Sequence, residues 1–336
     1  MRSLKVGLIG CGGFAKGMHI PILKSNPKYT IYAAMDLYEE AAKGVAESTG
    51  AAYWTTDVDK LLSDKEIDVV FITTRHDSHA ELSVKAANAG KHVMCEKPMA
   101  LNREECKAIV DAVKKNNIKY TVGYNRGMAP MITKARDLIN EELPGKKKMI
   151  YHRIQAPFPE SHWTHLPEIG GGRFVGEGCH IFDLLCEIVQ SPPVTVYASG
   201  GTFLNPEKVK IPDSGIITIT FADGSVATTL INSAGCPDFP KEATEIYCDG
   251  KAIFINDFTK MEYYGFEGHK KTYMEFDKVD KGHAIELDML ADSIINDTES
   301  PNGLIKATRA AVISFMVNES IKTGTPVSIT KEDYIL

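Results

Sequence analysis

The chain has 336 residues, of which 43% are hydrophobic and 24% charged, and its formal net charge is −6. This acidic balance, with no long basic run, argues against nucleic acid and against an anionic membrane as partners. No apolar run approaches about 18 residues, and Met1 leads almost directly into a predicted strand, so we expect a cytoplasmic protein. Seven scattered cysteines without a C-x-x-C pair indicate neither disulfides nor a cysteine zinc site.

Strands and helices are predicted to alternate over the first 123 residues. The apolar runs end in polar residues or glycine, as buried parallel strands do. This alternation is typical of a doubly wound parallel sheet with helices on both faces. The expected strands span residues 4–9, 30–35, 68–72, 92–95 and 119–123, and the expected helices span residues 18–24, 39–48, 78–89 and 103–115.

A glycine-rich turn follows the first predicted strand. It has the pattern Gly10-x-Gly12-x-x-Ala15, in which the first glycine makes the tight turn and the second lets backbone approach a pyrophosphate. Ala15 is small enough for the next helix to pack closely against the strand. We therefore predict a Rossmann dinucleotide-binding domain over residues 1–123, with a phosphate-binding loop formed by Gly10, Gly12, Gly13, Phe14 and Ala15.

The second predicted strand ends at Asp36, 21 residues after Ala15. That spacing is typical of a carboxylate that binds the adenosine ribose hydroxyls. Asp36 would repel a 2′-phosphate, and residues 37–40 offer no arginine to receive one. The sequence therefore favours NAD over NADP as the cofactor.

From residue 124 onward the pattern changes to a few helices and many consecutive strands. Helices are expected over residues 131–142 and 176–189, with hairpin turns at 222–225 and 249–250. We predict a second, α+β domain over residues 124–336, built on a large, mostly antiparallel open sheet. In the strand 216–221, one face carries threonines, which suits either solvent or a homodimer or homotetramer interface.

Further motifs follow in a fixed order along the chain: AGKHVMCEKP at 89–98, GYNR at 123–126, and the glycine triplet 170–172 followed by His180 and Asp183. With the glycine turn and Asp36, these make the chain resemble the glucose–fructose oxidoreductase/inositol dehydrogenase (Gfo/Idh/MocA) family over essentially its whole length. The resemblance implies an NAD(P)-dependent dehydrogenase or reductase acting on a CH–OH group, with a sugar or polyol as its small-molecule substrate.

The same resemblance implies three catalytic residues. The histidine matching His180 is the general base, and the matching Asp183 binds or orients the substrate. Histidine suits this role because its pKa lies near about 6.5, and hydride leaves a carbinol carbon only as the hydroxyl proton is taken up. Lys97 matches a lysine whose ammonium sits by the reacting hydroxyl and stabilises a developing alkoxide. The Lys97–Pro98 bond is a candidate cis peptide.

Other residues are assigned by their place in these motifs. The residues expected to bind substrate are Asn125, Trp163, His165, Glu177 and His283, and those expected to bind the cofactor, besides the glycine loop and Asp36, are Thr73, Thr74, His79, Glu96 and Lys97. Packing alone is the alternative for Trp163 and His165, and bracing of the domain junction is the alternative for Asn125 and Arg126. His76 and His79 lack a third ligand at metal spacing, so no metal site is expected.

The chain departs from the family pattern at one position. Many inositol dehydrogenase-like members carry an Asp four residues before the histidine, where this chain has Gly176. Glu177 is the nearest acid, about 100° further round the helix. It either substitutes with its longer side chain or is simply an acid favoured by the first turn of the helix.

Other function classes remain open at this point. The chain is alternatively a dinucleotide-binding sensor without turnover, or a glycosidase that uses bound NAD for a transient oxidation. A methyltransferase is disfavoured, because nothing after Asp36 resembles a methyl-transfer site.

Overall fold

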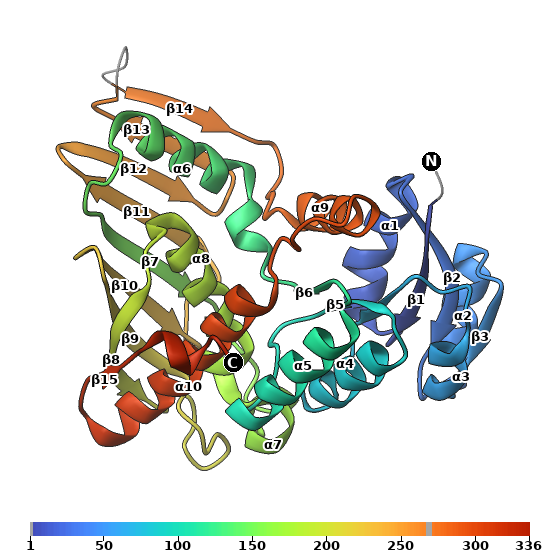
Figure 1. Ribbon diagram of the computed structural model, residues 1–336. Helices are drawn as coiled ribbons and strands as arrows, with labels where there is room; N and C mark the ends of the chain where they lie inside the picture. The colour runs from blue at the N-terminus through green and yellow to red at the C-terminus, as the bar shows by residue number, and fades with distance from the viewer. Residues whose placement is uncertain (1–2, 267–270) are drawn as a thin grey trace. The chain divides into compact units, whose positions relative to one another are not determined.

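The computed structural model describes residues 3–266 and 271–336 (Figure 1). The chain forms two compact units. The N-terminal unit contains the described residues up to Gly123, together with Ala284–Thr308 and Leu336, and the C-terminal unit contains those of Tyr124–His283 and Arg309–Ile335. No helix in the described ranges is both long and apolar enough to cross a membrane.

The N-terminal unit is built on a six-stranded sheet in the order β3-β2-β1-β4-β5-β6. All of its pairings are parallel, which confirms the doubly wound arrangement. β4 and β6 are entirely buried, as expected for strands covered on both faces. The strands are β1 (Leu4–Ile9), β2 (Tyr29–Met35), β3 (Tyr53–Thr55), β4 (Val69–Ile72), β5 (His92–Cys95) and β6 (Tyr120–Val122).

The helices of this unit begin and end at local signals. Asp57 caps α3 by accepting two backbone N–H groups, Asn102 caps α5, and Gly50 ends α2 in the left-handed conformation. The elements are α1 (Ile20–Ser25), α2 (Glu39–Thr49), α3 (Val58–Ser63), α4 (His79–Asn88) and α5 (Arg103–Asn116), with short turns η1 (Ala15–His19) and η2 (His76–Ser78). η1 is a π-helical turn, which the sequence analysis did not predict.

A late segment of the chain returns to the N-terminal unit. α9 (His283–Ile295) buries Leu287, Leu290 and Ala291 in the same core as β1, β2 and β4. Asn302 then extends the edge of β6, because Val122 N–H donates to its carbonyl at 3.3 Å. Residues 284–308, which were expected in the second domain, belong to the N-terminal unit in the structure.

The C-terminal unit is built on a nine-stranded sheet in the order β14-β13-β12-β11-β7-β10-β9-β8-β15. Every neighbouring pair is antiparallel except β7 with β10, so the large, mostly antiparallel sheet is confirmed. Turns at 222–225 and 249–250 join β9 to β10 and β11 to β12, as predicted. The strands are β7 (Met149–Gln155), β8 (Pro193–Gly201), β9 (Ser214–Phe221), β10 (Val226–Asn232), β11 (Glu242–Cys248), β12 (Lys251–Asn256), β13 (Lys260–Tyr264), β14 (Lys271–Glu275) and β15 (Val327–Ser328).

The two faces of this sheet differ in what covers them. α6 (Pro130–Glu142), α8 (Cys179–Val189) and the later part of α10 (Leu304–Thr323) share the core with residues of one face, such as Ile217 and Ile219 of β9. On the other face, Thr218 and Thr228 join across β9 and β10 at 3.0 Å. Exposed apolar side chains also belong to this outer face, at Met149, Tyr197, Ile216 and Tyr247.

Candidate functional site

The glycine turn after β1 is fixed by its contact with the loop after β4. Gly10 has φ +93°, and a Cβ at this position would lie 2.8 Å from the backbone of Thr73. The Thr73 hydroxyl donates a hydrogen bond to the Gly10 carbonyl at 2.6 Å. Only glycine combines this conformation with this close approach.

The next two glycines face open space. A Cβ on Gly12 or Gly13 would have no heavy atom within 4 Å, and Phe14 is 47% exposed, whereas Ala15 is fully buried beneath it. The helical run of η1 and α1 starts here with N–H groups that have no partner earlier in the helix. The turn therefore has the room and the donors that a dinucleotide pyrophosphate requires.

Asp36 is held against this turn by backbone donors. Its carboxylate accepts the N–H of Cys11 at 2.7 Å and that of Tyr38 at 2.9 Å. Burial, reinforced by the charge of Asp36, raises the pKa of the Cys11 thiol to about 12, so this cysteine stays protonated. The carboxylate thus lies at the edge of the glycine turn.

Two buried histidines hold the segment that contains Lys97. His19, at the end of η1, bonds to Glu96 through Nε2 and Oε1 at 2.7 Å. On the other side of Lys97, the Pro98 carbonyl lies 2.8 Å from Nδ1 of His79. The Lys97–Pro98 peptide is cis, as predicted. Lys97 is thereby tied to the helix that follows the glycine turn.

His79 joins two loops instead of facing open space. Its Nε2 lies 3.2 Å from the carbonyl of Thr74, so each ring nitrogen meets a backbone acceptor. Burial alone would lower the pKa of His79, but the charge of Cys95 and the hydrogen bonds outweigh it and raise the pKa to about 9. Thr74 itself bonds to Ser78 at 2.6 Å. Direct contact of His79 with a cofactor stays a prediction.

In the C-terminal unit, Glu177, His180 and Asp183 follow one another at three-residue steps across η5 (Phe174–Gly178) and α8. They therefore share a face of the helical run. His180 is 6% exposed and its ring centroid lies 6.1 Å from that of Tyr124. A Cβ on Gly127 would lie 3.7 Å from the Asp183 carboxylate, so η3 (Asn125–Met128) packs directly against this face.

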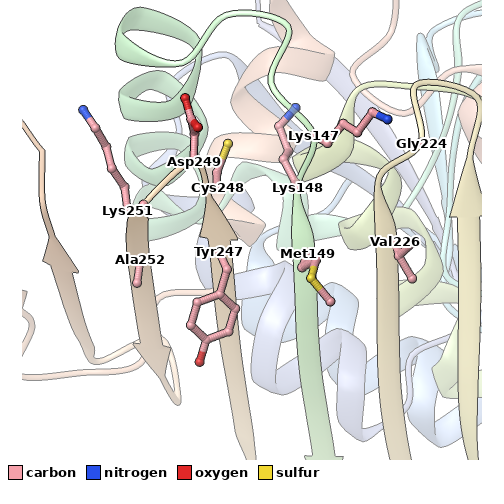
Figure 2. A pocket seen from close by; sticks show the side chains of 11 residues that line it. Lys147, Lys148, Met149, Gly224, Val226, Tyr247, Cys248, Asp249, Lys251 and Ala252 are labelled. Atoms are coloured by element: carbon pink, nitrogen blue, oxygen red, sulfur yellow. The ribbon is translucent and has the colours of Figure 1, made fainter.

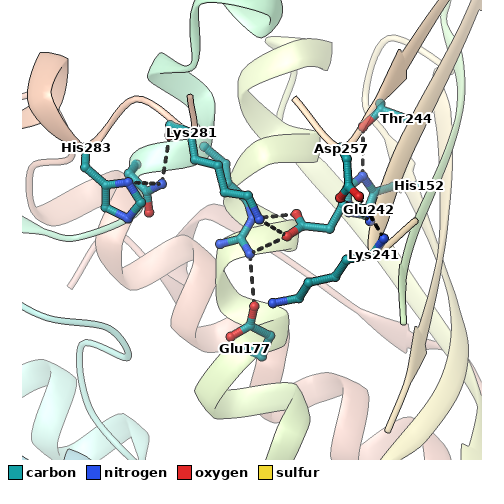
Figure 3. A network of polar contacts seen from close by, with 10 residues as sticks. His152, Glu177, Lys241, Glu242, Thr244, Asp257, Lys281 and His283 are labelled. Atoms are coloured by element: carbon teal, nitrogen blue, oxygen red, sulfur yellow. Dashed lines mark hydrogen bonds and ion pairs between the residues drawn. The ribbon is translucent and has the colours of Figure 1, made fainter. Parts of the chain in front are cut away.

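Arg126 of η3 organises a buried network of charges (Figure 3). Its Nε and Nη2 donate to the Glu242 carboxylate of β11 at 2.8 and 3.0 Å, and Nη2 also donates to Glu177 at 2.9 Å. Lys281 is a second cation bound to Glu242. Burial alone would raise the pKa of Glu242, but the Arg126 charge and hydrogen bonds hold it well below its usual range. Arg126 thus braces Glu177 within this unit.

Asn125 and His283 meet at the end of the same unit. The Asn125 side-chain amide donates to the carbonyl of Lys281 at 2.7 Å and lies 3.5 Å from Nδ1 of His283. Gly282 between them has φ +86°, and a Cβ there would lie 2.7 Å from the Asn125 carbonyl. The close packing of this corner explains how two residues so far apart in the sequence come together.

Trp163 and His165 lie on the short turn η4 (Trp163–His165), next to α7 (Pro167–Gly170). Gly170, the first of the glycine triplet, is required because a Cβ would overlap the backbone of Thr164. His165 is buried, and its ring centroid lies 5.3 Å from that of Phe158. Trp163 contacts His162, with 5.2 Å between ring centroids.

The sequence analysis missed several residues that hold these groups in place. They are His19, Glu242 and Lys281, and Arg173, which lies on the same helical run as Glu177 and His180, was missed as well. His19 and Glu242 carry no local signal, because their partners lie 77 and 116 residues away in the sequence. Arg173 had a signal, since it directly follows the glycine triplet and precedes Glu177 by four residues.

A separate cavity of about 650 Å³ opens at the ends of β7, β10, β11 and β12 (Figure 2). None of the predicted site residues lines it. The buried ammonium of Lys148 donates to the Val189 carbonyl at 3.2 Å, and Lys251 pairs with Glu142. These two cations of the cavity therefore have partners within the protein.

The chain matches models of a known family, and it is similar to known proteins in sequence and in fold. Residues 4–124 match the model of an oxidoreductase family described as an NAD-binding Rossmann fold, and residues 132–253 match the GFO/IDH/MocA C-terminal domain. The chain is 27% identical to the uncharacterized oxidoreductase YrbE of Bacillus subtilis over 99% of both chains. It is 26% identical to the myo-inositol 2-dehydrogenase of Thermotoga maritima over 66% of both chains. A solved levoglucosan dehydrogenase in complex with NADH has the same fold, with a TM-score of 0.89 and 22% identity over 98% of this chain and 100% of that one.

Proposed function

The chain belongs to the Gfo/Idh/MocA oxidoreductase family, and we propose that it transfers hydride between NAD(H) and a secondary alcohol or ketone of a sugar, polyol or glycoside. Two similar proteins are named for inositol and levoglucosan, which supports a small polyhydroxylated substrate. The substrate itself is part of the proposal.

One observation carries this proposal. Glu96 bonds to His19, the last residue of the turn that follows the glycine loop. This contact keeps Lys97 next to the part of the N-terminal unit that has room for a dinucleotide. A lysine at the carboxyl end of a parallel strand is well placed to meet a ligand bound there.

The choice of NAD over NADP rests on Asp36. Its carboxylate is bound to the backbone of the glycine turn and would repel a 2′-phosphate while accepting ribose hydroxyls. Leu37 and Tyr38, which follow it, are both exposed and carry no positive charge.

A dinucleotide held by the glycine turn and Asp36 would supply the nicotinamide that exchanges hydride with the substrate. In the oxidation direction, His180 takes the hydroxyl proton while the hydrogen on the carbinol carbon leaves with the C–H electron pair as hydride. The alcohol thereby becomes a ketone. Lys97 stabilises the negative charge that develops on the oxygen. Asp183 accepts hydrogen bonds from neighbouring hydroxyls and so orients the sugar.

Glu177 takes the place of the acid that is absent at Gly176. Arg126 donates to it at 2.9 Å, which orients the carboxylate. An ionised carboxylate is an acceptor for sugar hydroxyls rather than a proton donor. Asn125, Trp163, His165 and His283 complete the proposed substrate contacts.

Replacement of the two proton-handling residues tests the proposal. Lys97→Met and His180→Asn are each expected to lower kcat at least about 100-fold, while NADH affinity, measured by its fluorescence, changes less than about threefold. Inositols, aldoses, ketoses, sugar acids and glycosides are screened with NAD and with NADP. Full turnover in both variants would overturn these roles, and aglycone release without NADH formation would indicate a glycosidase instead.

We also propose that the protein is a homodimer or homotetramer that uses the outer face of the nine-stranded sheet. Met149, Tyr197, Ile216 and Tyr247 are exposed there, and apolar patches of this kind often mark an interface. Light scattering of the protein and of Ile216→Lys tests this, with a mass near one chain in the unmodified protein as the contradicting result.

A further inference from the structure

Arg173 is a buried cation that lies over the aromatic ring of Phe158. It is only 7% exposed, and its guanidinium carbon lies 4.2 Å from the ring centre of Phe158. Within the described residues, no hydrogen bond or ion pair joins its guanidinium to another side chain or to the backbone, and Nε is buried without a partner. A buried charge in this condition is unfavourable unless something else binds it.

Arg126 of the same unit is a buried arginine whose guanidinium donates hydrogen bonds to carboxylates of the protein. It is equally buried, at 4% exposed, yet it bonds to both Glu242 and Glu177. The other nearby acid, Asp213, accepts a hydrogen bond from the Ser214 hydroxyl at 2.6 Å and others from the backbone of the 203–204 segment. The carboxylates around Arg173 thus have other partners, and burial lowers its pKa.

The surroundings of Arg173 indicate where its ligand belongs. Arg173, Glu177 and His180 are spaced by four and three residues on one helical run, so they lie along one face. His165 is buried, and its ring centroid lies 5.3 Å from that of the same Phe158 ring. The guanidinium of Arg173 and the imidazole of His165 therefore lie at the Arg173 end of this set of proposed substrate residues.

The charge balance selects the ligand chemistry. Burial lowers the pKa of His165, so the imidazole is neutral near pH 7. Arg173 is attracted by the charges of Glu177 and Asp213, but its guanidinium donates no hydrogen bond to either carboxylate within the described residues. One guanidinium, with two parallel N–H donors, fits a planar carboxylate carrying a single negative charge. A phosphate monoester brings nearly two negative charges next to Glu177, and the second cation nearby, Arg126, is already bound to Glu242 and Glu177.

We propose that Arg173 binds the carboxylate of an acidic sugar, so that the substrate class is a uronic or aldonic acid or a glycoside of one. This inference rests on the proposed dehydrogenase function. Arg173 is then a specificity-determining residue, because a neutral sugar would leave its guanidinium buried and unpaired.

Paired substrates test the inference. NAD-dependent turnover is measured with D-glucuronate against D-glucose, D-galacturonate against D-galactose, and D-gluconate against D-sorbitol. The unmodified protein is expected to prefer at least one acid over its neutral partner by about 100-fold in kcat/KM. Arg173→Met is expected to abolish that preference, mainly by raising KM for the acid.

A binding experiment gives a readout that does not depend on turnover. Calorimetric titration of the NADH-loaded protein with the same acids is expected to show binding that Arg173→Met weakens about 100-fold. Arg173→Lys keeps the charge but loses the two-point geometry. Its affinity for the acids is therefore expected to lie between those of the unmodified protein and of Arg173→Met. The matched control is Arg153→Met, because Arg153 also lies over a phenylalanine ring, at 4.4 Å, but donates to the Pro240 carbonyl.

The outcomes separate this inference from the proposed function. Neutral sugars oxidised as well as acids, with no effect of Arg173→Met, would overturn the carboxylate site and leave the dehydrogenase standing. Binding of the acids that depends on Arg173, without any hydride transfer, would support the carboxylate site and overturn the dehydrogenase function. Preference for glucose 6-phosphate over glucuronate, or equal losses in the Arg173 and Arg153 variants, also contradicts the inference.

Discussion

In the N-terminal unit, polar side chains around the glycine turn bind mainly backbone groups, whereas in the C-terminal unit they bind one another as charges. Asp36 and His79 contact backbone N–H and carbonyl groups. Arg126, Glu242 and Lys281 instead form a buried ionic network. A side chain that bonds to backbone groups fixes a loop whatever the neighbouring side chains are. The stability of a buried network of charged side chains depends instead on every one of its members. The two units should therefore respond differently to mutation and to pH.

Removal of Glu242 should have the largest effect on stability. Glu242→Ala leaves Arg126 and Lys281 buried without their shared carboxylate, and breaking a buried pair in this way costs about 3–5 kcal/mol. Urea unfolding measures the loss. The control is Asp111→Ala, which removes an exposed pair with Lys107 on α5 and should change stability by less than about 0.5 kcal/mol. Equal losses of stability in Glu242→Ala and Asp111→Ala would contradict the proposed difference between the two units.

A wholly buried histidine in the C-terminal unit should destabilise the protein in acid. Burial, the largest cause, lowers the pKa of His152 to about 4 from its ordinary value of 6.5. Between these values the unfolded chain binds a proton that the folded chain does not, so the free energy of unfolding falls as pH falls from 6.5 to 4, by about 3 kcal/mol. His152→Gln, compared by urea unfolding across this range, should show a shallower decline.

His79 of the N-terminal unit should act in the opposite direction. Its pKa is raised to about 9, so its contribution to stability is fully present below pH 6.5 and is lost as pH rises through 9. A neutral ring donates to only one of the two carbonyls it meets. His79→Gln should lower stability by about 1–2 kcal/mol at pH 7 and flatten the alkaline decline. An unchanged alkaline decline would contradict this assignment.

The glycine turn offers the most local contrast, between two glycines that are two residues apart. Gly10→Ala forces a positive φ and a backbone overlap with Thr73, at a cost of about 1–3 kcal/mol. Gly12→Ala meets nothing within 4 Å and should leave stability nearly unchanged while weakening NADH binding, measured by fluorescence. A stable Gly10→Ala variant with unaltered NADH affinity would show that this turn tolerates a side chain.

Much of the fold could be predicted because its signals are local. The apolar runs ending at Ile9 and Ile72 formed the expected parallel strands, and Asp249-Gly250 formed the expected hairpin turn. β13 and β15 were missed. β15 has only two residues, too few to produce the alternating pattern by which strands are recognised.

Strand runs, turn glycines and the 21-residue step to Asp36 are determined by the sequence itself, because each depends on the conformation or spacing of neighbouring residues. Only the tertiary structure decided that His19 holds Glu96, that Glu242 holds Arg126, and that residues 284–308 pack with the N-terminal unit. The same is true of Arg173, whose Nε is buried without a hydrogen-bond acceptor among the described residues, as is visible only once every nearby carboxylate has been placed. Contacts between residues far apart in the chain depend on the folded packing, which no local pattern specifies.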